Sequence, residues 1–420
     1  MEDIKKGYKQ TDIGVIPEDW EARSLGSIIT KTQLGGNYPN HGIQNDTPLI
    51  KMGNLNRGYI NLEKVQYIKS TSKSSEQDKL YFGDLLFNTR NTLDLVGKVA
   101  IWRNELNNAY FNSNIMRIKF NEKYISTNFF MNLVLNTKQT VEQLRGIAIG
   151  TTSVAAIYNR DLFTLQIVLP TKEEQTAIAT VLSDTDALIA ALDKKIAKKQ
   201  QIKQGAMQQL LTGKKRLPGF SGEWVEKRLG DVFFVRSGYG FPISFQGNKD
   251  GVIPFYKVSD MNNVGNEVFL SLSNNYISEE DANKLNIRQF KKGSIIFAKI
   301  GAAIFLERKR IASCNCSIDN NMMALEKKED STEETYFYHL LNTMKLSDLS
   351  SSSALPSLSS NTIENMIISI PNTKTEQTAI AQILTDMDLE IAQLEKERDK
   401  YKELKAGMMQ VLLTGKVRLI

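Results

Sequence analysis

A long internal repeat constrains the fold of this chain more than any other feature. Residues 171–217 align without a gap with residues 373–419 at a shift of 202 positions, and 27 of the 47 aligned residues are identical. Shorter matches precede each copy in the same order, such as GDLLF at 83–87 and GSIIF at 293–297. The chain is therefore a tandem duplication, in which a variable segment is followed by a nearly constant one, twice.

The two constant segments are predicted to be helices of about 40 residues. Thr171 with Glu174, and Thr373 with Glu376, match a capping box, and a glycine follows each apolar pattern where a C-cap is expected. Apolar residues recur at spacings of four and three, which is typical of a coiled-coil seam. Two independent helices, each packed on its own domain, are the alternative. The seam residues are Ile178, Leu182, Ile189, Leu192 and Ile196 in the first copy, and Ile380, Leu384, Met387, Ile391 and Leu394 in the second.

The two variable segments are predicted to be α+β domains that are rich in strands. Short apolar runs at 85–87, 165–169 and 294–297 lie near turn residues, and residues 127–137 and 335–344 have helical patterns. We therefore expect an α+β chain with four parts: a domain over 1–170, a helix over 171–217, a domain over 218–372 and a helix over 373–420.

The combination of these segments resembles the specificity (S) subunit of type I restriction–modification enzymes. The resemblance covers essentially the whole chain, and it depends on the paired motifs EQTAIA (174–179 and 376–381) and LLTGK (210–214 and 412–416). It implies that each variable segment is a target recognition domain reading one half of a split site in double-stranded DNA. It also implies that the helices pair antiparallel as a spacer and dock two methyltransferase subunits, which nuclease subunits then join, and that the chain has no catalytic residues.

The sequence itself offers little material for catalysis or metal binding. It has two histidines and two cysteines, and it lacks a phosphate-binding G-x-x-x-x-G-K-[ST] loop and the tetrapeptides that amino-methyltransferases use to hold a flipped base. Cys314 and Cys316 have no second metal-binding pair. We expect no metal, no cofactor and no enzymatic activity. An enzyme with an unrecognised site and a coiled-coil scaffold without a DNA role remain the alternatives.

Neither a membrane-spanning run nor the core of a signal peptide is seen in the sequence. No apolar run approaches the about 20 residues that a membrane-spanning helix needs, and the first residues lack the apolar core of a signal peptide. We therefore expect a cytoplasmic protein with no membrane partner.

Charge predicts where DNA could bind. The net charge is +6, yet residues 218–372 carry 16 basic and 18 acidic residues, so cations of the second domain must gather on one face if it binds DNA. Arginine and asparagine are the usual base readers, and lysine is suited to phosphate. The candidates are Lys51, Arg57, Arg90, Asn91 and Lys98 in the first domain, and Arg236, Tyr239, Lys257, Lys299 and Ser352 in the second.

Two further sets of residues are candidates for contacts with partner subunits. The paired carboxylates Asp184/Asp186 and Asp386/Asp388 occupy equivalent helix positions and are expected to face solvent or a partner. The apolar clusters at the two helix ends are expected to leave excess apolar surface for docking. These clusters are Met207, Leu210 and Leu211, with Met409, Leu412 and Leu413.

Overall fold

The computed structural model describes residues 6–351 and 355–419. It divides into two compact units that do not follow the chain in order. Unit 1 contains the described residues up to Asp193 together with those from Lys396 onward, and unit 2 contains Lys194–Glu395. Each unit therefore combines one recognition domain with half of each long helix, whereas the sequence suggested four consecutive parts.

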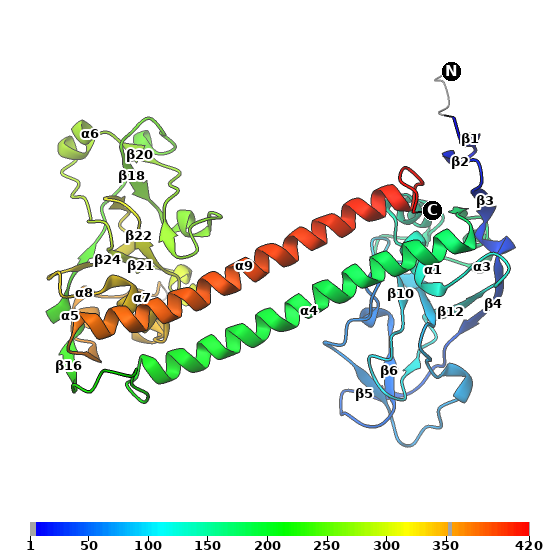
Figure 1. Ribbon diagram of the computed structural model, residues 1–420, viewed down its shortest axis with the longest axis horizontal. Helices are drawn as coiled ribbons and strands as arrows, with labels where there is room; N and C mark the ends of the chain where they lie inside the picture. Colours follow the sequence, from blue (N-terminus) through cyan, green and yellow to red (C-terminus); the bar gives the residue numbers. More distant parts are fainter. Residues whose placement is uncertain (1–5, 352–354, 420) are drawn as a thin grey trace. The chain divides into compact units, whose positions relative to one another are not determined.

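The two constant segments are helices, as predicted. Helix α4 spans Lys172–Leu210 and helix α9 spans Lys374–Leu412, each with 39 residues. Within each unit, the first half of one helix lies beside the second half of the other (Figure 1). Gly213 and Gly415 follow with φ of +70° and +71°, in the left-handed region that a helix C-cap requires and that glycine adopts without strain.

The recognition domain of unit 1 is a mixed α+β fold built on two four-stranded sheets. The first has the strand order β10-β8-β12-β4, and the second β11-β6-β7-β5. Smaller groups pair β1 with β2, β15 with β3, and β13 with β14 and β9. The strands are β1 Tyr8–Thr11, β2 Gly14–Pro17, β3 Glu21–Ser24, β4 Ile29–Leu34, β5 Asn40–His41, β6 Pro48–Ile50, β7 Gln66–Ile68, β8 Leu85–Asn88, β9 Arg90–Asn91, β10 Val99–Ile101, β11 Tyr110–Phe111, β12 Ile115–Phe120, β13 Ile149–Gly150, β14 Ala155–Ala156 and β15 Gln166–Leu169. The helices are α1 Asn128–Leu135, α2 Lys138–Gly146 and α3 Asn159–Leu162.

The recognition domain of unit 2 repeats this plan with a five-stranded sheet. Its order is β17-β24-β21-β22-β19, beside the three-stranded group β20-β18-β23 and the pair β16–β25. The strands are β16 Trp224–Arg228, β17 Phe233–Ser237, β18 Ile253–Tyr256, β19 Phe269–Leu270, β20 Tyr276–Ile277, β21 Ile295–Ala298, β22 Lys309–Ala312, β23 Ser317–Ile318, β24 Met322–Lys327 and β25 Ile367–Pro371. The helices are α5 Leu229–Val232, α6 Glu279–Lys284, α7 Glu334–Asn342 and α8 Ser360–Glu364.

The core of each unit continues from the sheet into the long helices. In unit 1, Phe87 and Ile118 of the sheet belong to the same apolar cluster as Ile178 and Leu182 of α4. In unit 2, Phe297 belongs to one cluster with Ile380 and Leu384 of α9. The first turns of each long helix are therefore part of a domain core, and the seam residues Leu192, Ile196, Ile391 and Leu394 are also buried.

Candidate nucleic-acid interface

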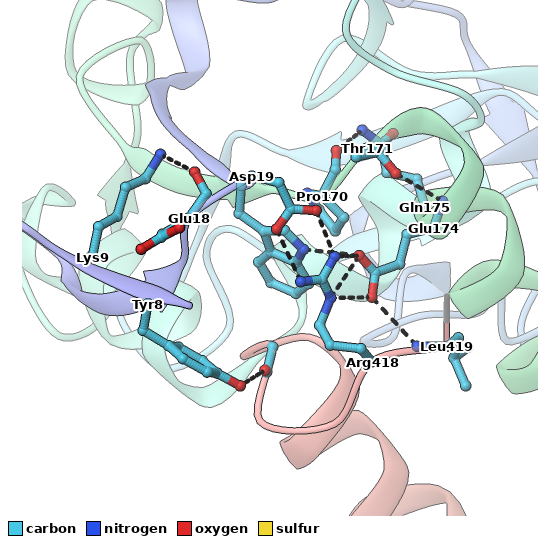
Figure 2. Close-up of polar contacts among 12 residues, drawn as sticks. Tyr8, Lys9, Glu18, Asp19, Pro170, Thr171, Glu174, Gln175, Arg418 and Leu419 are labelled. Atoms are coloured by element: carbon cyan, nitrogen blue, oxygen red, sulfur yellow. Dashed lines mark hydrogen bonds and ion pairs between the residues drawn. The ribbon is translucent and has the colours of Figure 1, made fainter. Parts of the chain in front are cut away.

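A buried carboxylate fixes the start of α4 in unit 1. The Glu174 side chain is fully buried and accepts hydrogen bonds from Trp20 Nε1 at 2.9 Å and from Arg418 Nε at 2.7 Å. Arg418 lies between Glu174 and Asp19, whose Oδ2 is 2.7 Å from its Nη2 (Figure 2). This arrangement lowers the pKa of Asp19, chiefly through the hydrogen bond from Arg418, and raises the pKa of Arg418, chiefly through Glu174.

The same joint occurs in unit 2. Glu376 at the start of α9 accepts hydrogen bonds from Arg216 at 2.6 and 2.7 Å and from Trp224 Nε1 at 3.4 Å. In both units the N-cap threonine accepts from the amide of the glutamate, as Thr171 does at 3.3 Å. Only this half of the predicted capping box is formed, because each glutamate side chain is used by the arginine and tryptophan instead. The capping-box prediction was therefore half wrong.

Ion pairs link α4 to α9 at equivalent places. Lys405 Nζ is 2.6 Å from Asp186 in unit 1, and Lys203 pairs with Asp388 in unit 2. Lys199 also binds Glu390 at 2.7 Å in unit 2. Unit 2 has the pairs Lys199–Glu390 and Lys203–Asp388, and unit 1 has Asp186–Lys405 and Asp193–Arg398. In each unit the residue numbers rise along one helix and fall along the other, so the two helices pair antiparallel. These contacts show that Asp186 and Asp388 face the other helix.

The apolar clusters at the helix ends are internal. Leu210 and Leu211 are buried in the core cluster of unit 2, and Leu412 and Leu413 in that of unit 1. Met207 and Met409 are partly buried against the same clusters. The prediction of excess apolar surface at the helix ends is therefore wrong, because each helix end packs on a recognition domain of its own chain. The docking role inferred from that surface loses its support.

The DNA-binding candidates of unit 1 fall into separate places. Lys51 and Arg57 lie on either side of a short 3-10 turn after β6, and Lys51 Nζ donates to Asn40 at 3.3 Å. Arg57 is near Lys98, and its Nη1 donates to the carbonyl oxygen of Gly97, in the turn before β10, at 3.4 Å. Arg90, on β9, is exposed and lines an open cleft with Asn114 and Tyr158, and Asn91 follows it. The structure therefore brings Arg57 and Lys98 together and leaves Arg90 elsewhere.

The candidates of unit 2 are also dispersed. Lys257 Nζ donates to Gln246 at 2.9 Å, and Lys299 Nζ donates to Ser237 at 2.8 Å. Burial lowers the pKa of Lys299. The backbone of Tyr239 forms an isolated parallel β-bridge with that of Asp319, and its ring packs near the ring of Phe290. Ser352 lies outside the described residues.

Arg236 lines a cleft of unit 2. Its guanidinium lies over the exposed ring of Phe234, 4.6 Å from the centroid, and Lys328 lies over the same ring at 5.1 Å. Its Nη1 is buried without a hydrogen-bond partner. Arg228, Asn361 and Asn365 complete the cleft, together with the carboxylates Asp231 and Glu364. Cations over an aromatic ring suit a nucleic-acid backbone, although the two acids reduce the local positive charge.

Sequence reasoning missed one repeated contact. Lys98 Nζ donates to Asn56 Oδ1 at 3.3 Å in unit 1, and Arg308 donates to Asn262 in unit 2. The signal was present in the spacing: Lys98 follows Phe87 by the same number of residues as Arg308 follows Phe297. Asn56 likewise follows Lys51 by the same number of residues as Asn262 follows Lys257.

The part of the chain that the structure describes contains neither a cluster that could hold a metal ion nor a membrane-spanning helix. Among residues 6–351 and 355–419, no group of three or more histidine, cysteine or acidic side chains could hold a metal ion. Cys314 is exposed and Cys316 is buried, which raises the pKa of the Cys316 thiol. No helix within these ranges has the length and apolar character needed to cross a membrane.

Known proteins share both the sequence pattern and the fold. The type I restriction–modification enzymes MjaVIII and MjaIX of Methanocaldococcus jannaschii have specificity subunits that are 23% and 27% identical, over 96% and 87% of this chain and 94% and 86% of theirs. The specificity subunit assigned to MjaX of the same organism is 25% identical over 99% of this chain and 97% of its own length. The crystal structure of a type I S subunit from M. genitalium superposes with a TM-score of 0.62, at 17% identity, over 94% of this chain and 96% of that one.

A second solved structure, described for complex assembly and conformational transition of a type I system, has a TM-score of 0.55 at 17% identity, over 96% of this chain and 99% of that one. The family profile of the type I restriction modification DNA specificity domain matches twice, at residues 17–204 and 221–406. Each match takes in one recognition domain and most of the long helix that follows it. The chain therefore belongs to the family of type I restriction–modification DNA specificity proteins, whose function is sequence-specific DNA recognition.

Proposed function

We propose that this chain is the non-catalytic, DNA-reading subunit of a cytoplasmic type I restriction–modification complex, and that each recognition domain reads one half of a split site. The observation that supports this most directly is the repeated attachment of the two domains. The Trp20–Glu174–Arg418 joint of unit 1 has its counterpart in unit 2, and the Lys405–Asp186 pair has its counterpart in Lys203–Asp388. Two domains that diverge in sequence but attach to the helices alike suit two different half-sites.

The partners in this proposal are two methyltransferase subunits and, through them, nuclease subunits. A chain with two equivalent attachment geometries offers the same contacts twice, which suits a partner present in two copies. The name of the second solved structure supports assembly of related chains into such complexes. The docking surface is proposed on outward-facing positions of the helices, since the apolar ends are buried.

Exchange of one recognition domain tests the proposal. Unit 1 of this chain would be replaced by that of a relative, using residues 1–193 together with 396–420, and the chimera would be expressed with its methyltransferase subunits. Mapping of methylated sites across the genome should show one half of the recognised sequence changed and the other half kept. Change of both halves would contradict modular reading, and the absence of sequence-specific methylation with the unaltered chain would contradict the proposed function.

A further inference from the structure

A cation and an asparagine meet at the same place in both recognition domains. Lys98 immediately precedes β10 and Arg308 immediately precedes β22. The register confirms their equivalence, because Phe87 of β8 pairs with Val99 and Phe297 of β21 pairs with Lys309. The two asparagines are equivalent as well, since each lies five residues after the lysine of PLIK (48–51) or PFYK (254–257), with Asn262 ending its 3-10 segment and Asn56 lying just after the corresponding one.

The asparagine leaves the charge of its cation in place. An amide oxygen accepts a hydrogen bond and orients the cation, but it does not neutralise it as a carboxylate would. Among the described residues, Lys98 and Arg308 form no ion pair with a carboxylate. Lys98 and Arg308 are therefore positive charges that an asparagine orients and that no carboxylate neutralises.

Each pair lies beside a second cation that is half-buried. Arg57 has a buried Nη2 without a hydrogen-bond partner, and burial and the neighbouring Arg145 lower its pKa. Burial and Arg57 in turn lower the pKa of Lys98. In unit 2, Arg310 has a buried Nε without a partner, and burial lowers its pKa, with Arg308 adding to the effect.

The nearby carboxylates do not cancel this charge. Asp94 approaches Arg145 at 3.8 Å with an almost fully exposed side chain, and Glu267 acts on Arg310 only as a longer-range charge. Neighbouring cations that repel each other and have lost part of their hydration are stabilised when an anion binds. Both places therefore favour an anionic ligand.

We infer that Lys98 with Asn56, and Arg308 with Asn262, are equivalent clamps for a DNA phosphate, one in each recognition domain. This inference rests on the proposed function. The ligand is a backbone phosphate and not a base edge, because the same contact chemistry occurs in two domains that read different half-sites. A position shared by both domains can fix their register on the duplex, whereas bases must be read at positions where the domains differ, such as Arg90 and its counterpart Ile300.

The salt dependence of DNA binding tests the clamps directly. The full chain would be titrated with a fluorescent random-sequence duplex of about 40 base pairs at salt concentrations from about 50 to 200 mM, because phosphate contacts contribute to non-specific binding. Each lost contact removes about 0.9 from the slope of log K against log salt concentration. The double variant K98Q/R308Q should therefore lose about 12-fold less affinity over this range than the unaltered chain, because two contacts are absent.

Two control variants separate a clamp from general charge. The variant K98R/R308K keeps both charges and should keep the slope. The variant K64Q/K249Q removes two exposed lysines, one from each domain, and should change the slope much less. Equal loss of slope in both neutralised variants would overturn the clamps, and so would an unchanged slope in K98Q/R308Q that has the circular dichroism spectrum of the unaltered chain.

Methylation mapping supplies the second readout. With K98R/R308K in the assembled complex, the methylated sequence should stay the same in both halves. A changed base at either half-site would make the residue a base reader and overturn the phosphate assignment. If the unaltered chain itself shows no salt-dependent DNA binding, the proposed function fails, whereas normal binding with unaffected variants removes only the clamps.

Discussion

Lys405 of α9 pairs with Asp186 of α4, and the two residues 202 positions earlier and later, Lys203 and Asp388, form the same pair in the other unit. One contact therefore serves the chain twice with the roles of the two helices exchanged. Each lysine meets an acid of the other helix, so both pairs favour the antiparallel alignment of α4 and α9.

We expect a double-mutant cycle on this pair to show favourable coupling. The side chains of Lys405 and Asp186 are 24% and 41% exposed, so solvent screens the pair and the coupling should be about 0.5–1 kcal/mol. Urea unfolding of K405M, D186N and the double variant would measure it. Strictly additive effects of the two single variants would mean that the ion pair does not stabilise the helices.

The buried glutamate should matter more than the cap that was predicted beside it. E174Q leaves Arg418 facing a neutral amide in a buried joint, and breaking such a pair costs up to about 3 kcal/mol, somewhat less here because Asp19 still binds Arg418. T171A removes only the N-cap and should cost about 1 kcal/mol. Hydrogen exchange followed by mass spectrometry should show faster exchange in unit 1 for E174Q, and equal effects of the two variants would contradict this ranking.

Truncation of a helix-end leucine should act on folding of one unit. Leu412 is 3% exposed in the core of unit 1, so L412A should destabilise that unit by about 3 kcal/mol. L210A is the matched variant in unit 2 and should act there instead. Normal stability of L412A combined with loss of the methyltransferase subunit on size-exclusion chromatography would restore the docking role.

Acid should weaken unit 2 through one histidine. Burial, with a smaller effect of Lys203, lowers the pKa of His339 from 6.5 to about 4, although Asp388 acts in the opposite direction. The unfolded chain therefore takes up a proton first as the pH falls below 6.5, and stability is lost until the pH reaches about 4. Between pH 7 and pH 5 the chain should lose about 2 kcal/mol more than H339Q.

Urea unfolding at the two pH values checks this difference. H41Q is the control, since His41 is the other histidine and lies partly exposed in unit 1. A difference between pH 7 and pH 5 that is the same in the chain and in H339Q would show that His339 carries no such linkage.

Insertions in the helices should change the spacing between half-sites. Four residues added after Leu192 and four after Leu394 keep the seam nearly in phase and add about 6 Å to each helix. The gap between the half-sites should lengthen by one or two base pairs, at about 3.4 Å per pair, with both half-sites unchanged. Genome-wide methylation mapping would reveal the new gap, and an unchanged gap would mean that partner subunits set the distance.

The sequence allowed the helices and domains to be predicted because their signals are periodic or repeated. The seam around Leu182 and Leu384 followed from spacing, and the α+β domains from short apolar runs. Where a side chain has two possible partners, periodicity and repetition could not predict which of the two it contacts. Glu174 suits a capping box locally, but Arg418 and Trp20 are distant in sequence and offer stronger hydrogen bonds in a buried place. Leu412 and Leu413 likewise have an apolar pattern that fits a partner surface or a core, and only tertiary packing decides between them.

Because unit 1 is built from two separate stretches of the chain, its folding can be completed only after that of unit 2. Unit 2 is continuous from Lys194 to Glu395, so all of its contacts are available once that stretch has left the ribosome. Unit 1 lacks Arg418 and the apolar end of α9 until residues 396–420 emerge. The first domain to be translated is thus the last to be completed. Until Arg418 is translated, Glu174 lacks the arginine partner that it has in the folded unit.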